Sequence, residues 1–280
     1  MKGEGMERKV RKLREILKRM GKIMVAFSGG VDSSVLLKIA TESLDKRDII
    51  AVTAVSPTYT AQEKREAVKI ARAFKVKHVL VETDEFKDKR FVANPPERCF
   101  YCKSELFKKM EQLCRQYGFD SIVDGTNRDD SMDFRPGEKA RKIYGVRSPL
   151  QEAGMGKKEI RLYAKNKKLS FWDKPSMACI ASRIPYGQAI SKSRLKRIGE
   201  GEKFLRSLGF REVRLRDYGN LARIEISRER LEDAVRMKEK ISRKLKKAGY
   251  DYITLDLEGF RSGSMNRALK ILPPSNKNGK

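Results

Sequence analysis

Short apolar runs alternate with amphipathic segments along the N-terminal half of the chain. Runs of strand length occupy 23–27, 49–55, 78–81 and 121–123, and segments with helical spacing occupy 6–20, 33–43, 61–74 and 103–117. In the first helical segment, one face carries the apolar residues Val10, Leu13, Ile16, Leu17 and Met20. Strands and helices that alternate at this spacing predict an α/β fold, in which right-handed crossovers join parallel strands.

The pattern changes in the C-terminal half. Segment 146–190 is rich in Gly, Pro and Ser and contains one clear helical pattern, near 157–169, as expected for a bridge between domains. From about Ser191 the order becomes helix, strand (213–216), strand (222–226), helix (228–246) and strand (252–257). We therefore expect a parallel-sheet domain over 1–185, a smaller α+β domain over 186–272 and a flexible tail over 273–280.

The composition indicates a globular protein, because 280 residues with 39% hydrophobic positions can bury a sizeable core. The first residues lack the apolar core of a signal peptide, and no apolar run approaches the roughly 18 residues that span a bilayer. We expect a cytoplasmic protein with no membrane partner. The formal charge of +27 predicts attraction to phosphorylated ligands or nucleic acid, but it also suits a heat-adapted surface rich in ion pairs.

The strongest chemical signal is a string that follows an apolar strand and opens a helix: Ser28-Gly29-Gly30-Val31-Asp32-Ser33-Ser34. Paired glycines let the backbone turn tightly, successive N–H groups hold an anion, and the helix N-terminus adds its positive end. The string is neither a Walker A loop nor the dinucleotide G-x-G-x-x-G. It resembles the SGGxDSS signature of the PP-loop superfamily. That resemblance implies that the loop binds ATP through its pyrophosphate, with hydroxyl donors from Ser28, Ser33 and Ser34 and with Asp32 as a ligand of Mg²⁺.

A second polar loop, Asp124-Gly125-Thr126-Asn127, directly follows the apolar run 121–123. In open α/β sheets, ligands bind beyond the carboxyl ends of the strands. We therefore expect the loops near residues 28, 56 and 125 to converge on one crevice. Gly125 and Thr126 are accordingly predicted to bind ATP.

Cys99 and Cys102 form a CxxC pair in a chain with no visible export signal, so metal or redox chemistry is expected rather than a disulfide framework. The prolines at 95 and 96 are expected to keep the pair outside a helix until about residue 103. Basic neighbours on both sides favour thiolates. Two thiols at this spacing suit one metal ion or one iron–sulfur cluster.

Cys179 lies far away in sequence, and the converging loops can return it to the same crevice as Cys99 and Cys102. Three thiolates on a [4Fe–4S] cluster leave one iron without a protein ligand, where an extra sulfide can be carried to a substrate. We favour this cluster over zinc, because a structural zinc needs a fourth ligand and the single histidine, His78, starts a strand. Cys114 shares an apolar helical face and is expected to pack in the core.

With these residues in view, the chain resembles the LarE family, ATP-dependent sulfur transferases that build the nickel-pincer nucleotide cofactor. The resemblance covers nearly the whole chain and is carried by the segments 28–34, 94–103, 125–130, 145–150, 172–183 and 214–225. It implies an adenine nucleotide alpha hydrolase-like fold. The PP-loop ATP pyrophosphatase domain would span 1–185, with substrate or oligomer contacts in 186–272.

The resemblance also implies a reaction. Each carboxylate of pyridinium-3,5-biscarboxylic acid mononucleotide is adenylated by ATP and Mg²⁺ with release of pyrophosphate, and sulfur then displaces AMP. Family members with only the cysteine that matches Cys179 use it as a sacrificial sulfur donor. Cys99 and Cys102 instead match the branch thought to use a [4Fe–4S] cluster, so all three cysteines are expected to be catalytic. The expected partners are the nucleotide substrate, a sulfide or other sulfur donor, and further copies of the chain in a homo-oligomer.

The resemblance assigns five more residues to substrate or phosphate: Ser182, Arg183, Arg214, Arg216 and Glu225. For Arg183, a structural ion pair is an equal alternative. The chain departs from the family pattern at Asp217 and Tyr218, where a more basic pair is expected.

Three other classes of protein remain open. A tRNA thiolase shares the PP-loop, the adenylation step and sometimes a three-cysteine cluster, and the basic charge suits RNA. No RNA-binding module is recognisable, so nucleic acid is the less favoured partner. An amide-forming PP-loop ligase needs ammonia from a glutaminase, whose nucleophile segment is not visible. A nucleotide-binding protein without catalysis would leave Cys179 unexplained.

Overall fold

The computed structural model describes residues 2–132, 136–175 and 178–261, and the chain divides into two compact units. The first unit comprises the described residues of Met1–Asp88 and Glu97–Met177, and the second those of Lys89–Pro96 and Ala178–Lys280. The tail predicted over 273–280 lies outside the described residues. Within the described ranges, no helix is both long enough and apolar enough to cross a membrane.

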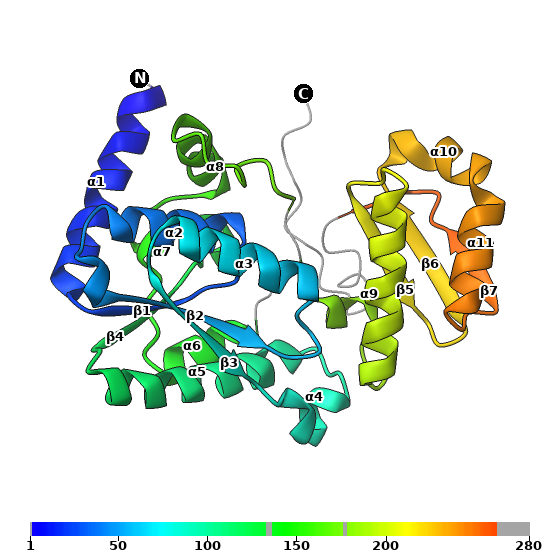
Figure 1. Cartoon of the computed structure of the whole chain (residues 1–280), viewed down its shortest axis with the longest axis horizontal. Coiled ribbons are helices and arrows are strands. Elements are labelled where there is room, and N and C mark those ends of the chain that lie inside the picture. Colours follow the sequence, from blue (N-terminus) through cyan, green and yellow to red (C-terminus); the bar gives the residue numbers. More distant parts are fainter. Residues whose placement is uncertain (1, 133–135, 176–177, 262–280) are drawn as a thin grey trace. The chain divides into compact units, whose positions relative to one another are not determined.

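A four-stranded parallel sheet forms the centre of the first unit (Figure 1). Its strands, in the order β3-β2-β1-β4, are β1 (Ile23–Ala26), β2 (Ile49–Val55), β3 (Lys77–Glu82) and β4 (Ser121–Asp124). The chain builds outward from β1 to β3 and then returns to the other side of β1 as β4. This reversal makes the carboxyl end of β1 a topological switch point, where ligands bind in α/β sheets. The predicted α/β fold class is confirmed.

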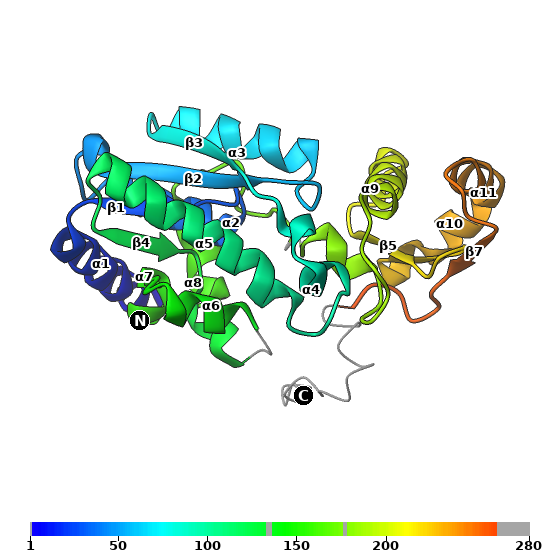
Figure 2. The same cartoon turned by 90° about the horizontal axis from the view of Figure 1, so that it is seen from below.

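Helices cover both faces of this sheet (Figures 1 and 2). One face carries α1 (Lys2–Met20), α2 (Val31–Thr41), α3 (Ala61–Ala73), α7 (Pro149–Glu152) and α8 (Lys157–Asn166). The other face carries α5 (Arg98–Tyr117) and α6 (Gly137–Ile143). The result is a three-layer arrangement in which the sheet is buried between helices.

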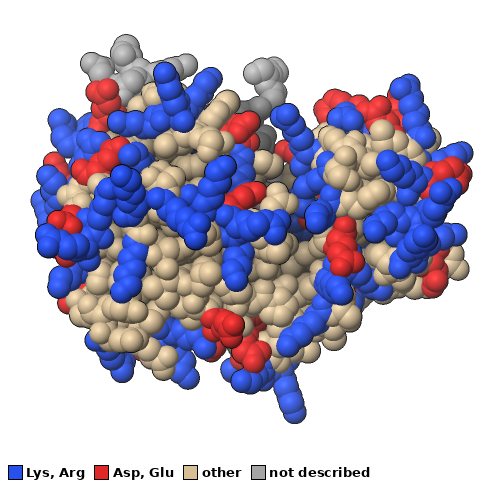
Figure 3. All heavy atoms as spheres, in the orientation of Figure 1, with Lys and Arg blue, Asp and Glu red and all other residues tan. Residues whose placement is uncertain are grey.

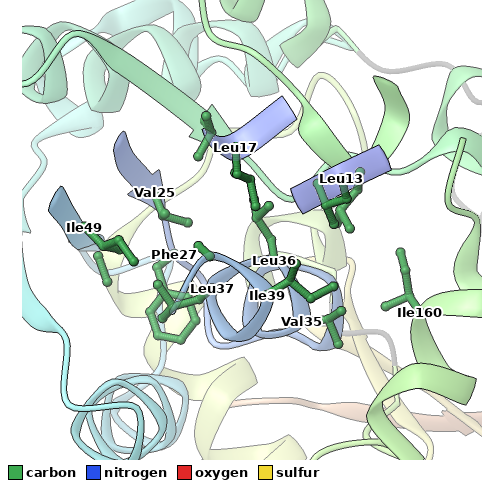
Figure 4. Close-up of a cluster of buried hydrophobic side chains, with 14 of the residues drawn as sticks. Leu13, Leu17, Val25, Phe27, Val35, Leu36, Leu37, Ile39, Ile49 and Ile160 are labelled. Carbon is green, nitrogen blue, oxygen red and sulfur yellow. The ribbon is translucent and has the colours of Figure 1, made fainter. Parts of the chain in front are cut away.

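Neighbouring residues of β1 point into different cores, because side chains alternate along a strand. Val25 packs in the core that contains α1 and α2, whereas Met24 packs with Phe107 of α5. Figure 4 shows Leu36 and Leu37 of α2 among buried side chains of that first core. Burial of each large apolar side chain stabilises the fold by about 1.5–3 kcal/mol. Helix α2 is therefore held firmly at the end of β1.

The second unit contains a three-stranded sheet in the order β5-β6-β7, with β6 antiparallel to β5 and parallel to β7. Its elements are α4 (Lys89–Val92), α9 (Lys192–Ser207), β5 (Val213–Asp217), β6 (Leu221–Ile226), α10 (Leu231–Arg236), α11 (Lys238–Lys247) and β7 (Tyr252–Leu255). Gly201 lets α9 lie close to β5, because a Cβ there would come within 2.4 Å of Leu215 Cδ2. The smaller C-terminal α+β region is thus confirmed.

Asn94 explains why residues 89–96 belong to the second unit. Its buried side-chain amide nitrogen lies 3.2, 2.7 and 3.0 Å from the carbonyl oxygens of Ile184, Pro185 and Gln188. Its own carbonyl oxygen accepts a hydrogen bond from Gly187 N–H at 3.0 Å. The segment 94–103, which carries part of the family resemblance, therefore begins with a structural anchor.

Two predicted helices have different boundaries in the structure. Helix α5 begins at Arg98, so Cys99 and Cys102 lie within its first five residues, and the prediction that they precede the helix was wrong. Pro96 stands just before the N-cap residue Glu97, where its missing N–H removes no helical hydrogen bond. The helix expected over 228–246 is divided into a 3₁₀ turn, α10 and α11, with a break at Met237.

Candidate active site

Residues 28–34 form the turn between β1 and α2 and leave the first N–H groups of that helix without a side-chain cap. Gly30 is the N-cap residue, and a glycine has no side chain to accept those hydrogen bonds. Uncapped N–H groups at a helix N-terminus attract anions. Gly29 has φ +66° and lies so close to α3 that a Cβ would be 3.0 Å from Ala67 Cα. This backbone suits an oxyanion such as a phosphate.

The serines of this loop add hydroxyl groups to the same place. Ser28 Oγ and Ser33 Oγ lie 3.1 Å apart, and Ser33 Oγ donates to the Gly30 carbonyl oxygen at 3.2 Å. Ser34 is fully buried, and its hydroxyl has no hydrogen-bond partner among the described residues. Buried hydroxyl groups without partners are rare, and a phosphate oxygen would supply the missing acceptor.

The loops after β2 and β4 meet the phosphate loop, so the predicted convergence is confirmed. Tyr59, which follows β2, donates from its hydroxyl to the Ser28 carbonyl oxygen at 2.8 Å. Gly125, which follows β4, leaves no room for a side chain, because a Cβ would lie 2.8 Å from Ser33 N. Thr126 is fixed beside it by hydrogen bonds from its N–H and its hydroxyl to Asp124, at 3.1 and 2.8 Å.

The carboxylates of Asp32 and Asp130 are close enough for the charge of one to act on the other. Burial raises the pKa of Asp32, and the negative charge of Asp130 raises it further. A hydrogen bond from Asn127 Nδ2, 3.0 Å long, acts in the opposite direction, as do the charges of Lys157 and Arg161. Two carboxylates that repel each other in a partly buried place would both be stabilised by a divalent cation.

The same residues allow a test of whether Mg²⁺ fits. Mg²⁺ is usually held by one or two carboxylates together with waters and substrate phosphates. Asp32 and Asp130 supply two oxygen ligands, and no three His, Cys, Asp or Glu side chains in the described ranges form a metal-binding group. Two carboxylates of this kind fit a Mg²⁺ ion that arrives with ATP.

Two contributors to this site have no role in the sequence prediction. Asn127 is fully buried, and beyond its bond to Asp32 it accepts from Asp129 N–H at 3.0 Å and donates its own N–H to Asp130 at 3.1 Å. Lys174 donates to the Gly29 carbonyl oxygen at 3.1 Å and pairs with Glu66 at 2.5 Å. Asn127 stands directly after Thr126 in the polar loop, and this position could have identified it as a site residue. Lys174 lies in the family-like string 172–183 but has no periodicity or motif that marks it by itself.

The CxxC pair lies at a helix N-terminus. Cys99 is exposed and Cys102 is half-buried, and a separation of three residues puts both on one face of α5. The positive end of a helix favours thiolates, the form that ligates metals. Two accessible thiols on one face fit two of the ligands of an iron–sulfur cluster. Cys102 is followed by Lys103, whose ammonium lies 3.7 Å from Asp124 at the end of β4.

Cys114 differs from these cysteines. It is buried between α5 and the sheet, with its Sγ 3.9 Å from Met24 Sδ. Burial, followed by the charges of Asp120 and Glu111, raises its pKa to about 11. A neutral thiol in a packed core is a poor nucleophile and a poor ligand. The prediction that Cys114 is a core residue is confirmed.

Cys179 belongs to the second unit, where it is exposed and precedes the 3₁₀ turn Ile180–Arg183. Arg183 in that turn is almost fully buried and binds Glu202 through Nε (2.7 Å) and Nη2 (3.3 Å). Its Nη1 donates to the Cys179 carbonyl oxygen at 3.2 Å and to Ser182 Oγ at 2.9 Å. Arg183 thus makes the ion pair that the sequence left open, and it also fixes the backbone at Cys179. A role of Ser182 and Arg183 towards substrate remains a prediction.

Arg214, Arg216 and Glu225 lie on β5 and β6 of the same unit. Arg216 forms a bidentate pair with Glu225, with distances of 2.9 and 2.8 Å, and its Nη1 donates to the Ser182 carbonyl oxygen at 2.9 Å. Burial, reinforced by the neighbouring charge of Arg183, lowers the pKa of Arg214 to about 10. These buried cations lie beside the turn that follows Cys179. Their contact with a substrate phosphate remains a prediction.

The first unit therefore has the features of an ATP-using PP-loop protein: a parallel sheet, an uncapped glycine-rich loop after β1, and acidic residues beside it. Residues 22–146 match the family model of the phosphoadenosine phosphosulfate reductase domain. An uncharacterized protein of Synechocystis is 39% identical over 94% of this chain and 99% of its own length. The pyridinium-3,5-bisthiocarboxylic acid mononucleotide synthase of Lactiplantibacillus plantarum is 36% identical over 90% of this chain and 92% of its own length. An uncharacterized protein of Methanocaldococcus jannaschii is 33% identical over 86% of this chain and 91% of its own length.

These relatives identify one family within the ATP-using PP-loop proteins. The chain belongs to the LarE family and is an ATP-dependent sulfur transferase.

Proposed function

We propose that this protein adenylates the carboxylates of pyridinium-3,5-biscarboxylic acid mononucleotide and converts them into thiocarboxylates for nickel-pincer nucleotide synthesis. The observation that carries the proposal is the likeness, over 90% of the chain, to the synthase of pyridinium-3,5-bisthiocarboxylic acid mononucleotide. The uncapped loop at 28–34 and the acidic pair beside it support the use of ATP.

In the first half-reaction, a substrate carboxylate oxygen attacks the α-phosphorus of ATP, and pyrophosphate leaves. The N–H groups at the start of α2, with the hydroxyl groups of Ser28, Ser33 and Ser34, would hold the pyrophosphate and stabilise its growing charge. Asp32 and Asp130 would bind the Mg²⁺ that neutralises the phosphates. The close approach of Gly125 to Ser33 supports a contact of the β4 loop, through Gly125 and Thr126, with the same nucleotide.

In the second half-reaction, sulfur attacks the acyl carbon of the adenylate, and AMP leaves with the former carboxylate oxygen. AMP is a far better leaving group than oxide, so the displacement becomes favourable. Cys99, Cys102 and Cys179 would hold a [4Fe–4S] cluster, which when bound supplies the transferred sulfide at its open iron. The exposed Cys99 and the half-buried Cys102, both within the first five residues of α5, support this assignment over the sacrificial use of Cys179 alone.

The test is a single turnover with anaerobically purified protein, the mononucleotide substrate and labelled ATP. We expect AMP and pyrophosphate release that depends on the substrate, a product heavier by the exchange of oxygen for sulfur, and a Cys179 of unchanged mass. Iron should be retained by wild type and by Cys114→Ala, and lost from Cys99→Ala. Sulfur transfer by iron-free Cys99→Ala, with Cys179 converted to dehydroalanine, would instead establish the sacrificial mechanism.

One observation favours a second candidate, a PP-loop tRNA thiolase with a three-cysteine cluster. The formal charge of +27 would attract tRNA strongly. The two functions are distinguished by the acceptor that stimulates release of AMP. Release that needs tRNA and yields thiouridine, with no response to the mononucleotide, would replace the first proposal by the second.

A further inference from the structure

Helix α11 (Lys238–Lys247) has an unusual concentration of positive charge. Its ten residues contain six Lys and Arg side chains and one acidic side chain, Glu239. All six basic side chains are exposed, and none of them forms an ion pair or hydrogen bond with another described side chain. Figure 3 shows Lys and Arg side chains gathered over the part of the second unit in which Figure 1 draws α11.

Four of the basic residues form one stripe along the helix. Their spacing is i, i+3, i+4 and i+7, which places on a common face Lys240, Arg243, Lys244 and Lys247. A different face is apolar and buried, through Ile241 and Leu245. The stripe spans seven residue steps, or about 10 Å at the helical rise. It is a fixed row of charges, because the buried face prevents the helix from rotating.

The stripe does not stabilise the helix. Like charges four residues apart destabilise a helix by about 0.2–0.5 kcal/mol per pair, and the stripe contains two such pairs. Glu239 precedes Arg243 by four residues but forms no ion pair with it. Other helices use that spacing for ion pairs: Lys38 with Glu42, Glu105 with Lys109, Glu111 with Arg115, Glu138 with Lys142, Glu202 with Arg206, and Glu232 with Arg236. A general surplus of surface ion pairs therefore does not account for α11.

We propose that this stripe of α11 binds single-stranded RNA through its phosphate backbone. Lys side chains suit phosphate as point charges, and a row of them matches a polyanion. A protein partner would need an apolar anchor at the centre of its contact, and insertion into a lipid surface would need an exposed apolar face. The apolar residues of α11 are buried, so neither requirement is met.

The shape of the helix and the chemistry of Arg243 select RNA among nucleic acids. A flexible single strand can follow all four charges along the helix. The guanidinium of Arg243 can also donate to a ribose 2′-hydroxyl, the group that distinguishes RNA from DNA. This inference is independent of the proposed sulfur transfer, because α11 contributes no residue to the candidate active site.

The experiment measures binding of a fluorescein-labelled oligo(U) RNA by anisotropy over a range of salt concentrations. In the test variant, all four stripe residues become Gln (K240Q, R243Q, K244Q and K247Q). The matched control changes four exposed cations of α1, which surround Glu15, to Gln (R11Q, K12Q, K18Q and R19Q). Both variants lose the same net charge. A third variant keeps the charges of the stripe, because each Lys becomes Arg and the Arg becomes Lys (K240R, R243K, K244R and K247R).

Each phosphate contact contributes about 0.7 to the slope of log K against log salt concentration for a single strand. We expect the stripe variant to lose about 3 from that slope and to bind at least about tenfold more weakly near 0.1 M salt. The α1 variant and the charge-preserving variant should remain within about twofold of wild type. All four proteins should fold and should show the same ATP-dependent AMP release.

Equal weakening in the stripe and α1 variants would overturn the inference, because it would show a response to net charge alone. Unchanged RNA binding in the stripe variant would overturn it directly. Stripe-dependent binding of duplex DNA, polyglutamate or phosphatidylserine vesicles that is as tight as that of oligo(U) would replace RNA by another partner. If the wild-type protein binds oligo(U) through the stripe but transfers no sulfur, the proposed function is contradicted and this inference stands.

Discussion

Asn127 offers the sharpest test of how the phosphate loop is organised. Its amide orientation is determined, because Asp129 N–H can only donate and therefore faces the amide oxygen, which leaves Nδ2 for Asp32. A hydrogen bond to a charged group contributes about 1.5–3 kcal/mol, which corresponds to roughly tenfold to 150-fold in an equilibrium constant. We expect Asn127→Ala to weaken binding of a non-hydrolysable Mg·ATP analogue by that factor.

The pH dependence gives a second readout for the same substitution. Burial and the charge of Asp130 already raise the pKa of Asp32, and the bond from Asn127 opposes them. Removing that bond raises the pKa of Asp32 further, so the acid limb of analogue binding should move to higher pH. Binding is measured by titration calorimetry, with melting temperatures recorded in parallel. The exposed Asn166→Ala is the control.

Two results would refute the reasoning. The first is wild-type affinity in a folded Asn127→Ala protein, which would show that Asp32 needs no support from the β4 loop. The second is a lowered melting temperature with unchanged affinity and an unchanged acid limb, which would reduce Asn127 to a structural role.

Three further predictions concern other parts of the molecule. Asp217→Asn should lower the free energy of unfolding of the second unit by about 3 kcal/mol, because it removes the anion that pairs with partly buried arginines. Burial would raise the pKa of Asp217, but hydrogen bonds from Arg197, Arg194 and the Gly219 backbone lower it below 3.8. The greater stability of the wild type should therefore be complete above pH 3.8 and disappear as the pH falls through the lower pKa of the folded state. Chemical denaturation over a range of pH measures this difference. Gly125→Ala should weaken analogue binding about tenfold, since its Cβ would lie 2.8 Å from Ser33 N, whereas Gly5→Ala, which meets nothing within 4 Å, should bind normally. Lys174→Met should weaken analogue binding, measured by the same calorimetry; normal affinity would exclude a role for this ammonium at the loop.

The sequence was sufficient to predict the sheet and the loop positions of the first unit, because the local hydrophobic pattern and the topology agree there. Alternating apolar runs predict the parallel sheet, and the carboxyl-end rule predicts that the loops at 28 and 125 meet. The contact of Gly125 with Ser33 bears this out. Asn127 could not be identified in the same way, because its value lies in three hydrogen bonds that only the folded loop brings together.

Helix boundaries and buried charges were less predictable. Propensity at 95–96 suggested a late start for α5, but a proline before the N-cap is compatible with a helix that begins at Arg98. The acidic residue at 217, an unexplained departure from the family pattern, proves to be the buried acceptor for Arg194, Arg197 and Tyr250. Asp217 therefore connects elements that are distant in sequence, and no local sequence pattern predicts such a contact.

The hydrogen bond from Lys174 to the Gly29 carbonyl oxygen fixes one end of the short chain segment that leads to Cys179. Cys179 follows Lys174 by five residue steps, so a fully stretched chain separates their Cα atoms by at most about 18 Å. While that hydrogen bond holds, the length of the chain keeps Cys179 within that distance of the Lys174 Cα atom. Glycines inserted between the two residues would raise this limit, and under the proposed role of Cys179 they should change the rate of sulfur transfer but not that of adenylation.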